Sequence, residues 1–113
     1  MQLQKVTFPK ITDSVLSEVV KKIVENFRPQ KIIMFGSQVW GISKEWSDID
    51  ILVILDSDES TSKLAAKISL VAKPHYIPMD ILVRTAEEIE HRVKIGDHFI
   101  KKVLVEGKVL YER

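Results

Sequence analysis

The sequence predicts an α/β domain in which helices flank a small mixed β-sheet. Stretches with apolar residues at helical spacing alternate along the chain with short runs that are almost wholly apolar, as is typical of buried strands. No linker, internal repeat or low-complexity tract interrupts this alternation. The 113 residues suffice for one hydrophobic core, so we expect a single domain over residues 1–113.

The first predicted element is an amphipathic helix that ends at Arg28-Pro29, because the residue before a proline disfavours helical backbone. Three polar residues can cap its start: Thr12, Asp13 or Ser14. A strand follows over residues 31–35, and then a Gly-Ser turn with a short helix after it. The next strand covers about residues 48–55 and begins with acidic side chains.

The second half of the chain continues the alternation. We expect a helix over residues 61–72, a strand over residues 77–84, and a further helix that starts after Thr85. Glu88 occupies the capping-box position of that helix, and Gly96 ends it. The last boundaries follow from single residues: a helix from Asp97 through Val105, a stop at Gly107 and a short strand that ends at Tyr111.

Acidic residues stand at the start of two predicted strands. Asp48 and Asp50 point to the same face, with Cα atoms about 7 Å apart, because side chains alternate along a strand. Like charges at that distance repel by about 2 kcal/mol at an effective dielectric constant of about 20. Asp80 opens a tetrapeptide identical to the one that begins at Asp50. If the two strands lie side by side with their starts at one edge, three carboxylates converge and require a cation.

The cation that suits such a cluster is Mg²⁺. It takes oxygen ligands in octahedral geometry, usually a few carboxylates together with waters and substrate phosphates. Two such ions about 3.5–4 Å apart would hold the attacking and leaving oxygens of a phosphoryl-type displacement. The sequence therefore favours phosphate chemistry with Asp48, Asp50 and Asp80 as catalytic and metal-binding residues.

Gly36-Ser37 follows an apolar run and forms the expected phosphate-binding turn. Glycine lets the backbone approach a ligand closely, and a helix that starts at Ser37 would direct free N–H groups toward an anion. A triphosphate suits this place. The spacing from Gly36 to Gly41 is similar to that of a P-loop, but Ile42 stands where that motif requires lysine, so we reject the P-loop reading.

Together these residues resemble the minimal nucleotidyltransferase domain of the polymerase-beta-type nucleotidyltransferase superfamily. Its short prokaryotic members carry a Gly-Ser turn, a Ser-Asp-x-Asp strand and one later aspartate, which match Gly36-Ser37, residues 47–50 and Asp80. Residues 107–112 also resemble the family's ending. The resemblance implies a nucleotidyltransferase fold and transfer of AMP from ATP to a hydroxyl acceptor. It also implies that Asp80 helps to deprotonate that hydroxyl.

The chain departs from the family motif at Trp40. Members often read Gly-Ser-x-Ala-Arg-Gly, and Trp40 takes the place of the arginine. Arginine offers a charged fork to phosphate oxygens, whereas tryptophan offers one neutral donor and a ring, so catalytic rate or nucleotide affinity is affected. Lys44 is one candidate to replace the charge. Trp40 and Trp46 flank the expected nucleotide site and either stack on a base or pack the loop down, of which we favour packing.

The resemblance also implies a protein partner. Short members commonly work beside a helical, RNA-cleaving toxin of the HEPN class, and they act as its antitoxin by attaching AMP to a toxin tyrosine. We therefore expect ATP as substrate and a HEPN-type protein as partner. Two alternatives stay open: a weakly active or inactive module that neutralises a partner by occlusion, and an adenylyltransferase for small molecules. Assembly as a homo-oligomer is compatible with each.

The amino-acid composition narrows the possible ligands and the possible location of the protein. The formal net charge of +1, from 17 basic and 16 acidic residues, argues against strong nucleic-acid binding. Cysteine is absent, which excludes disulfides and thiolate metal sites. We see no signal peptide and no apolar run of about 20 residues, so we expect a cytoplasmic protein without a membrane partner. Two groups should lie on the solvated surface: the histidines His75, His91 and His98, and the lysine pairs 21–22 and 101–102.

Overall fold

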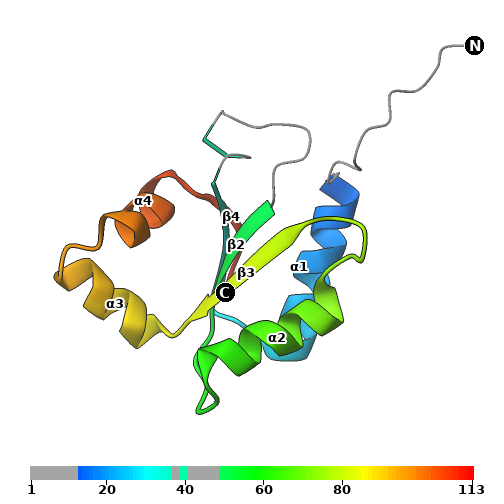
Figure 1. Cartoon of the computed structure of the whole chain (residues 1–113), viewed down its shortest axis with the longest axis horizontal. Helices are drawn as coiled ribbons and strands as arrows, with labels where there is room; N and C mark the ends of the chain where they lie inside the picture. The colour runs from blue at the N-terminus through cyan, green and yellow to red at the C-terminus, as the bar shows by residue number, and fades with distance from the viewer. Residues whose placement is uncertain (1–12, 37–38, 41–48) are drawn as a thin grey trace, which may run out of the picture.

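The computed structural model describes residues 13–36, 39–40 and 49–113. In this part of the chain, helices and strands form an α/β arrangement around one sheet (Figure 1). The helices are α1 (Asp13–Phe27), α2 (Thr61–Ala72), α3 (Ala86–Lys94) and α4 (His98–Glu106). The strands are β1 (Lys31–Phe35), β2 (Ile49–Ile54), β3 (Met79–Arg84) and β4 (Lys108–Glu112).

The sheet is mixed, and its strand order is β3-β2-β1-β4. β1 pairs antiparallel with both β2 and β4, whereas β2 and β3 run parallel. The parallel pair is joined through α2, which is the crossover connection that parallel strands require. This topology brings the end of β1 and the starts of β2, β3 and β4 to the same end of the sheet.

Helices cover both faces of the sheet. α1 and α2 lie on one side and α3 and α4 on the other (Figure 1). Alternating residues of the strands feed two hydrophobic cores: Ile32 and Ile51 face α1 and α2, whereas Ile33 and Leu52 face α3 and α4. All four of these side chains are fully buried. The central strands are therefore apolar on both faces, which explains their nearly continuous hydrophobic sequence.

The ends of the elements follow the expected local rules. β1 and α2 have the bounds that the sequence predicts. α3 begins with the expected capping box, in which Thr85 Oγ1 accepts from the Glu88 N–H (3.1 Å) and Glu88 Oε1 accepts from the Thr85 N–H (2.8 Å). Asp97 caps α4 by accepting the Ile100 N–H at 3.0 Å. These predictions are confirmed for the same reason, namely that each sequence signal acts between residues that are close together in the chain.

One strand begins slightly later than expected, and the start of another lies next to residues that the structure does not describe. β3 starts at Met79 rather than Ile77, because Pro78 has no N–H to donate to a strand ladder, although its carbonyl accepts the Ile49 N–H at 3.1 Å. β2 is described from Ile49 onward, and Asp48 lies outside the described residues. Thr12, the first expected cap of α1, also lies outside them.

The helices of the described residues are shorter or less apolar than a membrane-spanning helix. α1 is 15 residues long and alternates buried with exposed side chains, whereas about 20 apolar residues are needed to cross a bilayer. Within the described part of the chain, no helix combines the length and the apolar character of a membrane span.

Candidate active site at the start of the parallel strands

Asp50 and Asp80 are direct neighbours across the parallel strands. In the register of β2 and β3, Asp50 pairs with Asp80, and each is the second residue of its strand. Adjacent strands lie about 4.8 Å apart, and paired residues of a sheet point to the same face. Asp80 is exposed and Asp50 is half-buried. The two carboxylates thus lie side by side at the end of the sheet where β2 and β3 begin, and solvent and a ligand can reach them there. We call this place the acidic edge.

The face on which these carboxylates lie follows from the core residues around them. Two positions after Asp50, Leu52 is buried against α3 and α4, and Leu82 takes the same place after Asp80. Because side chains alternate along a strand, both carboxylates point to the face that α3 and α4 cover. They lie beyond the apolar core of that face, at the end of the sheet where β1 finishes.

Gly36 lies directly against the Asp50 carboxylate. Its neighbour Phe35 pairs with Asp50 across β1 and β2. Gly36 has φ +87°, a left-handed conformation that L side chains rarely adopt. A Cβ at this position would overlap Oδ2 of Asp50 and lie 3.3 Å from its Cγ. Glycine is therefore needed for two reasons: the backbone turn itself and the space that the carboxylate occupies.

The turn after β1 is fixed by hydrogen bonds to the Gly36 carbonyl. The backbone N–H groups of Val39 and Trp40 both donate to it, at 3.0 and 2.9 Å. Val39 and Trp40 lie in a turn, in agreement with the predicted turn, whereas the short helix predicted after it is not among the helices of the described residues. Ser37, the second residue of the predicted phosphate-binding turn, lies outside the described residues.

Trp40 packs its loop onto α4, which agrees with the favoured of its two predicted roles. Its indole N–H donates to the Glu106 carbonyl at 3.2 Å, at the end of α4. The ring lies 6.4 Å from the Phe35 ring between centroids, and Lys102 Nζ lies 4.1 Å from the Trp40 centroid. The Lys102 contact was missed by the sequence reasoning, which placed this lysine on a purely solvated helix face. Trp46 and Lys44 lie outside the described residues.

Other predicted surface residues lie where expected. The three histidines, His75, His91 and His98, are exposed, as are Lys21 and Lys22.

Among the described residues, no group of three or more acidic or histidine side chains could hold a metal ion. Asp48, the third member of the predicted cluster, lies outside the described residues.

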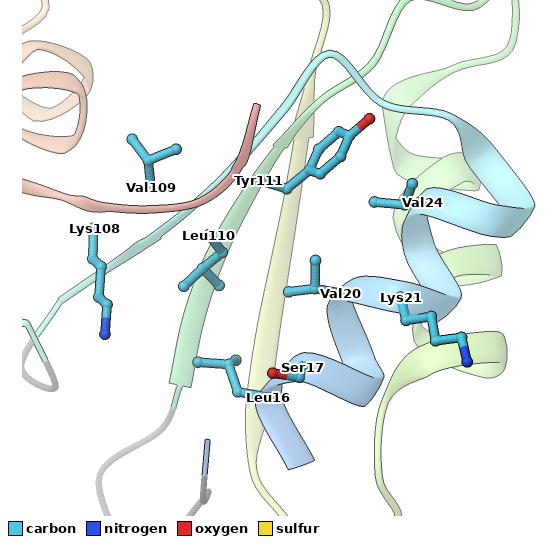
Figure 2. Close-up of a pocket in the computed structure, with 9 residues that line it drawn as sticks. All are labelled: Leu16, Ser17, Val20, Lys21, Val24, Lys108, Val109, Leu110 and Tyr111. Atoms are coloured by element: carbon cyan, nitrogen blue, oxygen red, sulfur yellow. The ribbon is translucent and has the colours of Figure 1, made fainter. Parts of the chain in front are cut away.

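A separate apolar groove lies between α1 and the edge strand β4 (Figure 2). Figure 2 shows Leu16 and Val20 of α1 on one side and Leu110 of β4 opposite them. The groove has a volume of about 510 Å³ and shares no lining residue with the acidic edge formed by Asp50 and Asp80. The two features are therefore distinct places on the molecule.

Comparison with known proteins identifies the family. A sequence model described as "Nucleotidyltransferase domain" matches residues 16–111, which is most of the chain. The chain belongs to the nucleotidyltransferase domain family. Its matched region contains Gly36, Asp50 and Asp80, so the acidic edge lies inside the nucleotidyltransferase domain.

Two known proteins show what this nucleotidyltransferase is similar to. A Methanocaldococcus jannaschii protein named "Putative protein adenylyltransferase MJ0604" is 34% identical over 102 residues, covering 88% of this chain and 97% of the relative. The crystal structure of a protein titled "putative nucleotidyltransferase" from Sulfolobus solfataricus matches with a TM-score of 0.63. At 18% identity, over 88% of this chain and 79% of that one, it supports the fold alone.

Two of the predicted magnesium ligands are neighbours in this nucleotidyltransferase, and their donor atoms are of the kind that Mg²⁺ takes. Asp50 and Asp80 contribute carboxylate oxygens, which are the ligands that Mg²⁺ prefers. Two like charges directly opposite each other in a sheet destabilise it unless a cation offsets them. The absence of a side chain at Gly36 leaves the Asp50 carboxylate room beside the turn. The described residues thus contain two carboxylates that would suit a magnesium ion, and the third expected ligand, Asp48, lies outside them.

Proposed function

We propose that this nucleotidyltransferase transfers AMP from ATP to a hydroxyl acceptor in a Mg²⁺-dependent reaction. The observation that carries the proposal is the parallel register of Asp50 with Asp80 beside Gly36, a glycine whose missing side chain makes room for a carboxylate. Membership of the nucleotidyltransferase family supports the reaction class. The name of the Methanocaldococcus relative, a protein adenylyltransferase, supports AMP as the transferred group.

In the proposed reaction, Asp48 and Asp50 hold Mg²⁺, and the triphosphate lies at the Gly36-Ser37 turn. When bound, the metal neutralises negative charge on the phosphates, and the family resemblance favours two ions. Asp80 completes the metal site and accepts the proton of the acceptor hydroxyl. The hydroxyl oxygen forms a bond to the α-phosphorus, the bond from that phosphorus to the bridging oxygen breaks, and pyrophosphate leaves with the bonding electrons.

We further propose that the acceptor is a protein side chain, namely a tyrosine of a HEPN-type toxin, and that this chain acts as the antitoxin. The printed name of the relative supports a protein acceptor. The HEPN partner and the antitoxin role rest on the resemblance of the Gly-Ser and Ser-Asp-x-Asp motifs to those of short family members. Neutralisation of the toxin by AMP transfer would require only catalytic amounts of this chain. Neutralisation by occlusion would instead require one copy of this chain for each copy of the toxin.

The test is label transfer from ATP that carries the label on its α-phosphate. The chain is incubated with Mg²⁺ and the protein encoded by the neighbouring gene, and the label on that protein is measured. We expect transfer by the wild type and a loss of about 100-fold or more in Asp50→Asn and Asp80→Asn. Asp58→Asn is the matched control, because Asp58 is an exposed aspartate on the loop before α2. Transfer that survives both active-site substitutions would refute the assigned roles.

Occlusion of a partner is the second candidate function, and Trp40 favours it. The indole that stands in the place of the family's arginine is held on α4 through the Glu106 carbonyl, so this position supplies no charged fork. A nucleotidyltransferase weakened in this way could still neutralise a partner by binding. Neutralisation that is stoichiometric and unchanged in the double variant Asp48→Asn/Asp50→Asn would establish occlusion. Neutralisation that requires ATP and is lost in this variant would exclude it.

A further inference from the structure

Lys102 contacts Trp40, a residue 62 positions earlier in the chain that follows the Gly36 turn. Its ammonium nitrogen lies 4.1 Å from the centroid of the Trp40 ring, a distance typical of a cation–π interaction. The backbone N–H of Trp40 donates to Gly36, and Gly36 in turn lies against the Asp50 carboxylate. A chain of direct contacts therefore connects Lys102 with the acidic edge of the sheet.

The end of α4 is held firmly at this edge. Gly107 joins α4 to β4, and Lys108 immediately after it pairs with Met34, two residues before Gly36. A Cβ at Gly107 would overlap the Val103 carbonyl and lie 2.5 Å from Ile33 Cγ2, so the helix end and β1 are in close contact. α4 also covers the same face of the sheet to which Asp50 and Asp80 point. Lys102 thus lies on the helix that covers the face to which Asp50 and Asp80 point, one turn before the end of that helix.

The charge of Lys102 is available for a ligand. The side chain is exposed, and it makes no ion pair of 4.0 Å or less with any described residue. A ring beneath an ammonium group restricts its position without neutralising its charge. Lysine also has a long, rotatable stem that can follow a phosphate oxygen. Lys101, which is its neighbour in sequence, is also exposed, but the cation–π contact with Trp40 is made by Lys102.

We propose that Lys102 is a phosphate-binding residue of this nucleotidyltransferase, held by the Trp40 ring so that its ammonium contacts the polyphosphate of a nucleotide at the Gly36 turn. This inference rests on the proposed function for its ligand, a nucleoside triphosphate. It adds a cation that the Gly-Ser and Ser-Asp-x-Asp motifs do not contain. The arrangement also gives Trp40 a second role, because the ring both closes the loop onto α4 and positions the lysine.

The test compares Lys102→Gln with Lys101→Gln, two substitutions of neighbouring exposed lysines. Binding of ATP and of inorganic tripolyphosphate is measured by titration calorimetry in Mg²⁺, and adenosine serves as the probe without phosphate. We expect Lys102→Gln to raise Kd for ATP and tripolyphosphate about tenfold, which corresponds to about 1.4 kcal/mol, and to leave adenosine binding unchanged. Lys101→Gln should stay within about twofold of the wild type. Lys102→Arg should keep most of the affinity.

The outcomes separate this inference from the proposed function. If AMP transfer depends on Asp50 but the two lysine variants bind ATP equally, Lys102 has no role and the proposed function stands. If tripolyphosphate binding depends on Lys102 but no acceptor receives AMP, the phosphate contact stands and the proposed function fails. If the wild type binds neither ATP nor tripolyphosphate, both are wrong. Circular dichroism of each variant shows whether a lost affinity reflects a lost fold.

Discussion

Gly36→Ala is the substitution for which the structure gives the sharpest expectation. Gly36 has φ +87°, and a Cβ there would overlap Oδ2 of Asp50. Alanine in a left-handed conformation costs about 1–2 kcal/mol. Forcing an extra methyl group into occupied space costs about 1–3 kcal/mol more. We therefore expect a loss of about 2–5 kcal/mol in the free energy of unfolding, a large part of the 5–15 kcal/mol that is typical of a domain.

Gly96 provides a matched control for the backbone term. It has φ +82°, nearly the same as Gly36, but a Cβ there would meet no atom within 4 Å. Gly96→Ala should therefore lose only the backbone term of about 1–2 kcal/mol. The gain from reduced freedom of the unfolded chain affects both alanines alike and cancels in the comparison. The difference between the two variants, about 1–3 kcal/mol, measures the collision with the carboxylate.

Urea unfolding followed by circular dichroism gives both free energies, and a double-mutant cycle assigns the difference. Asp50→Ala removes Oδ2 and Cγ, the two atoms that the new Cβ would crowd, and leaves only the Asp50 Cβ at 3.5 Å, an ordinary van der Waals contact. In that background, Gly36→Ala should cost no more than Gly96→Ala in the wild type. The reasoning is refuted if Gly36→Ala is no more destabilising than Gly96→Ala, or if the cost of Gly36→Ala stays the same after Asp50 is removed.

Three further predictions concern other parts of the structure. Thr85→Ala removes the cap of α3 and should lower the free energy of unfolding by about 1 kcal/mol, measured by urea unfolding. Gly107→Ala places a methyl group against the Val103 carbonyl and Ile33 at an ordinary backbone conformation, so it should cost about 1–3 kcal/mol through packing alone, measured in the same way. Asp80→Asn removes one of two neighbouring like charges and should lower AMP transfer without lowering the melting temperature, measured by label transfer and calorimetry.

Thr85→Ala has a control variant, and the other two predictions each have an outcome that would contradict them. Thr61→Ala is the control for Thr85→Ala, because Thr61 is the first residue of α2 and Ser60, not Thr61, caps that helix. A loss of unfolding free energy in Thr61→Ala equal to that in Thr85→Ala would argue against the capping explanation. Equal stability of Gly107→Ala and the wild type would show that the α4–β4 junction can move apart. A lower melting temperature in Asp80→Asn would indicate that the Asp80 carboxylate stabilises the fold rather than opposing Asp50.

The local features of the fold could be predicted because their causes lie within a few residues. The apolar run of residues 32–35 predicted the strand β1, and the helical spacing of residues 61–72 predicted the bounds of α2. Thr85 and Glu88 predicted a capping box because their hydrogen bonds join neighbours three residues apart. The start of β3 was predicted two residues early, because apolar content alone does not account for the missing N–H of Pro78.

The candidate site was predictable only in its composition. The repeated tetrapeptides that begin at Asp50 and Asp80 indicated matching strand starts, and the parallel register of β2 and β3 brings these two residues together. The positions of Asp48 and Ser37 stay predictions, because both lie outside the described residues. Lys102 was missed because its partner, Trp40, is 62 residues away in sequence and no local pattern relates them.

By itself, the sequence determined the types of the elements, many of their ends and the presence of glycine and aspartate at the end of one strand and the starts of two others. These depend on backbone preferences, on hydrophobic periodicity and on hydrogen bonds between near neighbours. Only the tertiary structure decided that β2 and β3 run parallel in register, that Gly36 makes room for Asp50, and that the loop of Trp40 closes onto α4. Those contacts form because two cores on opposite faces of one sheet must be buried together, and this packing joins residues that the chain keeps far apart.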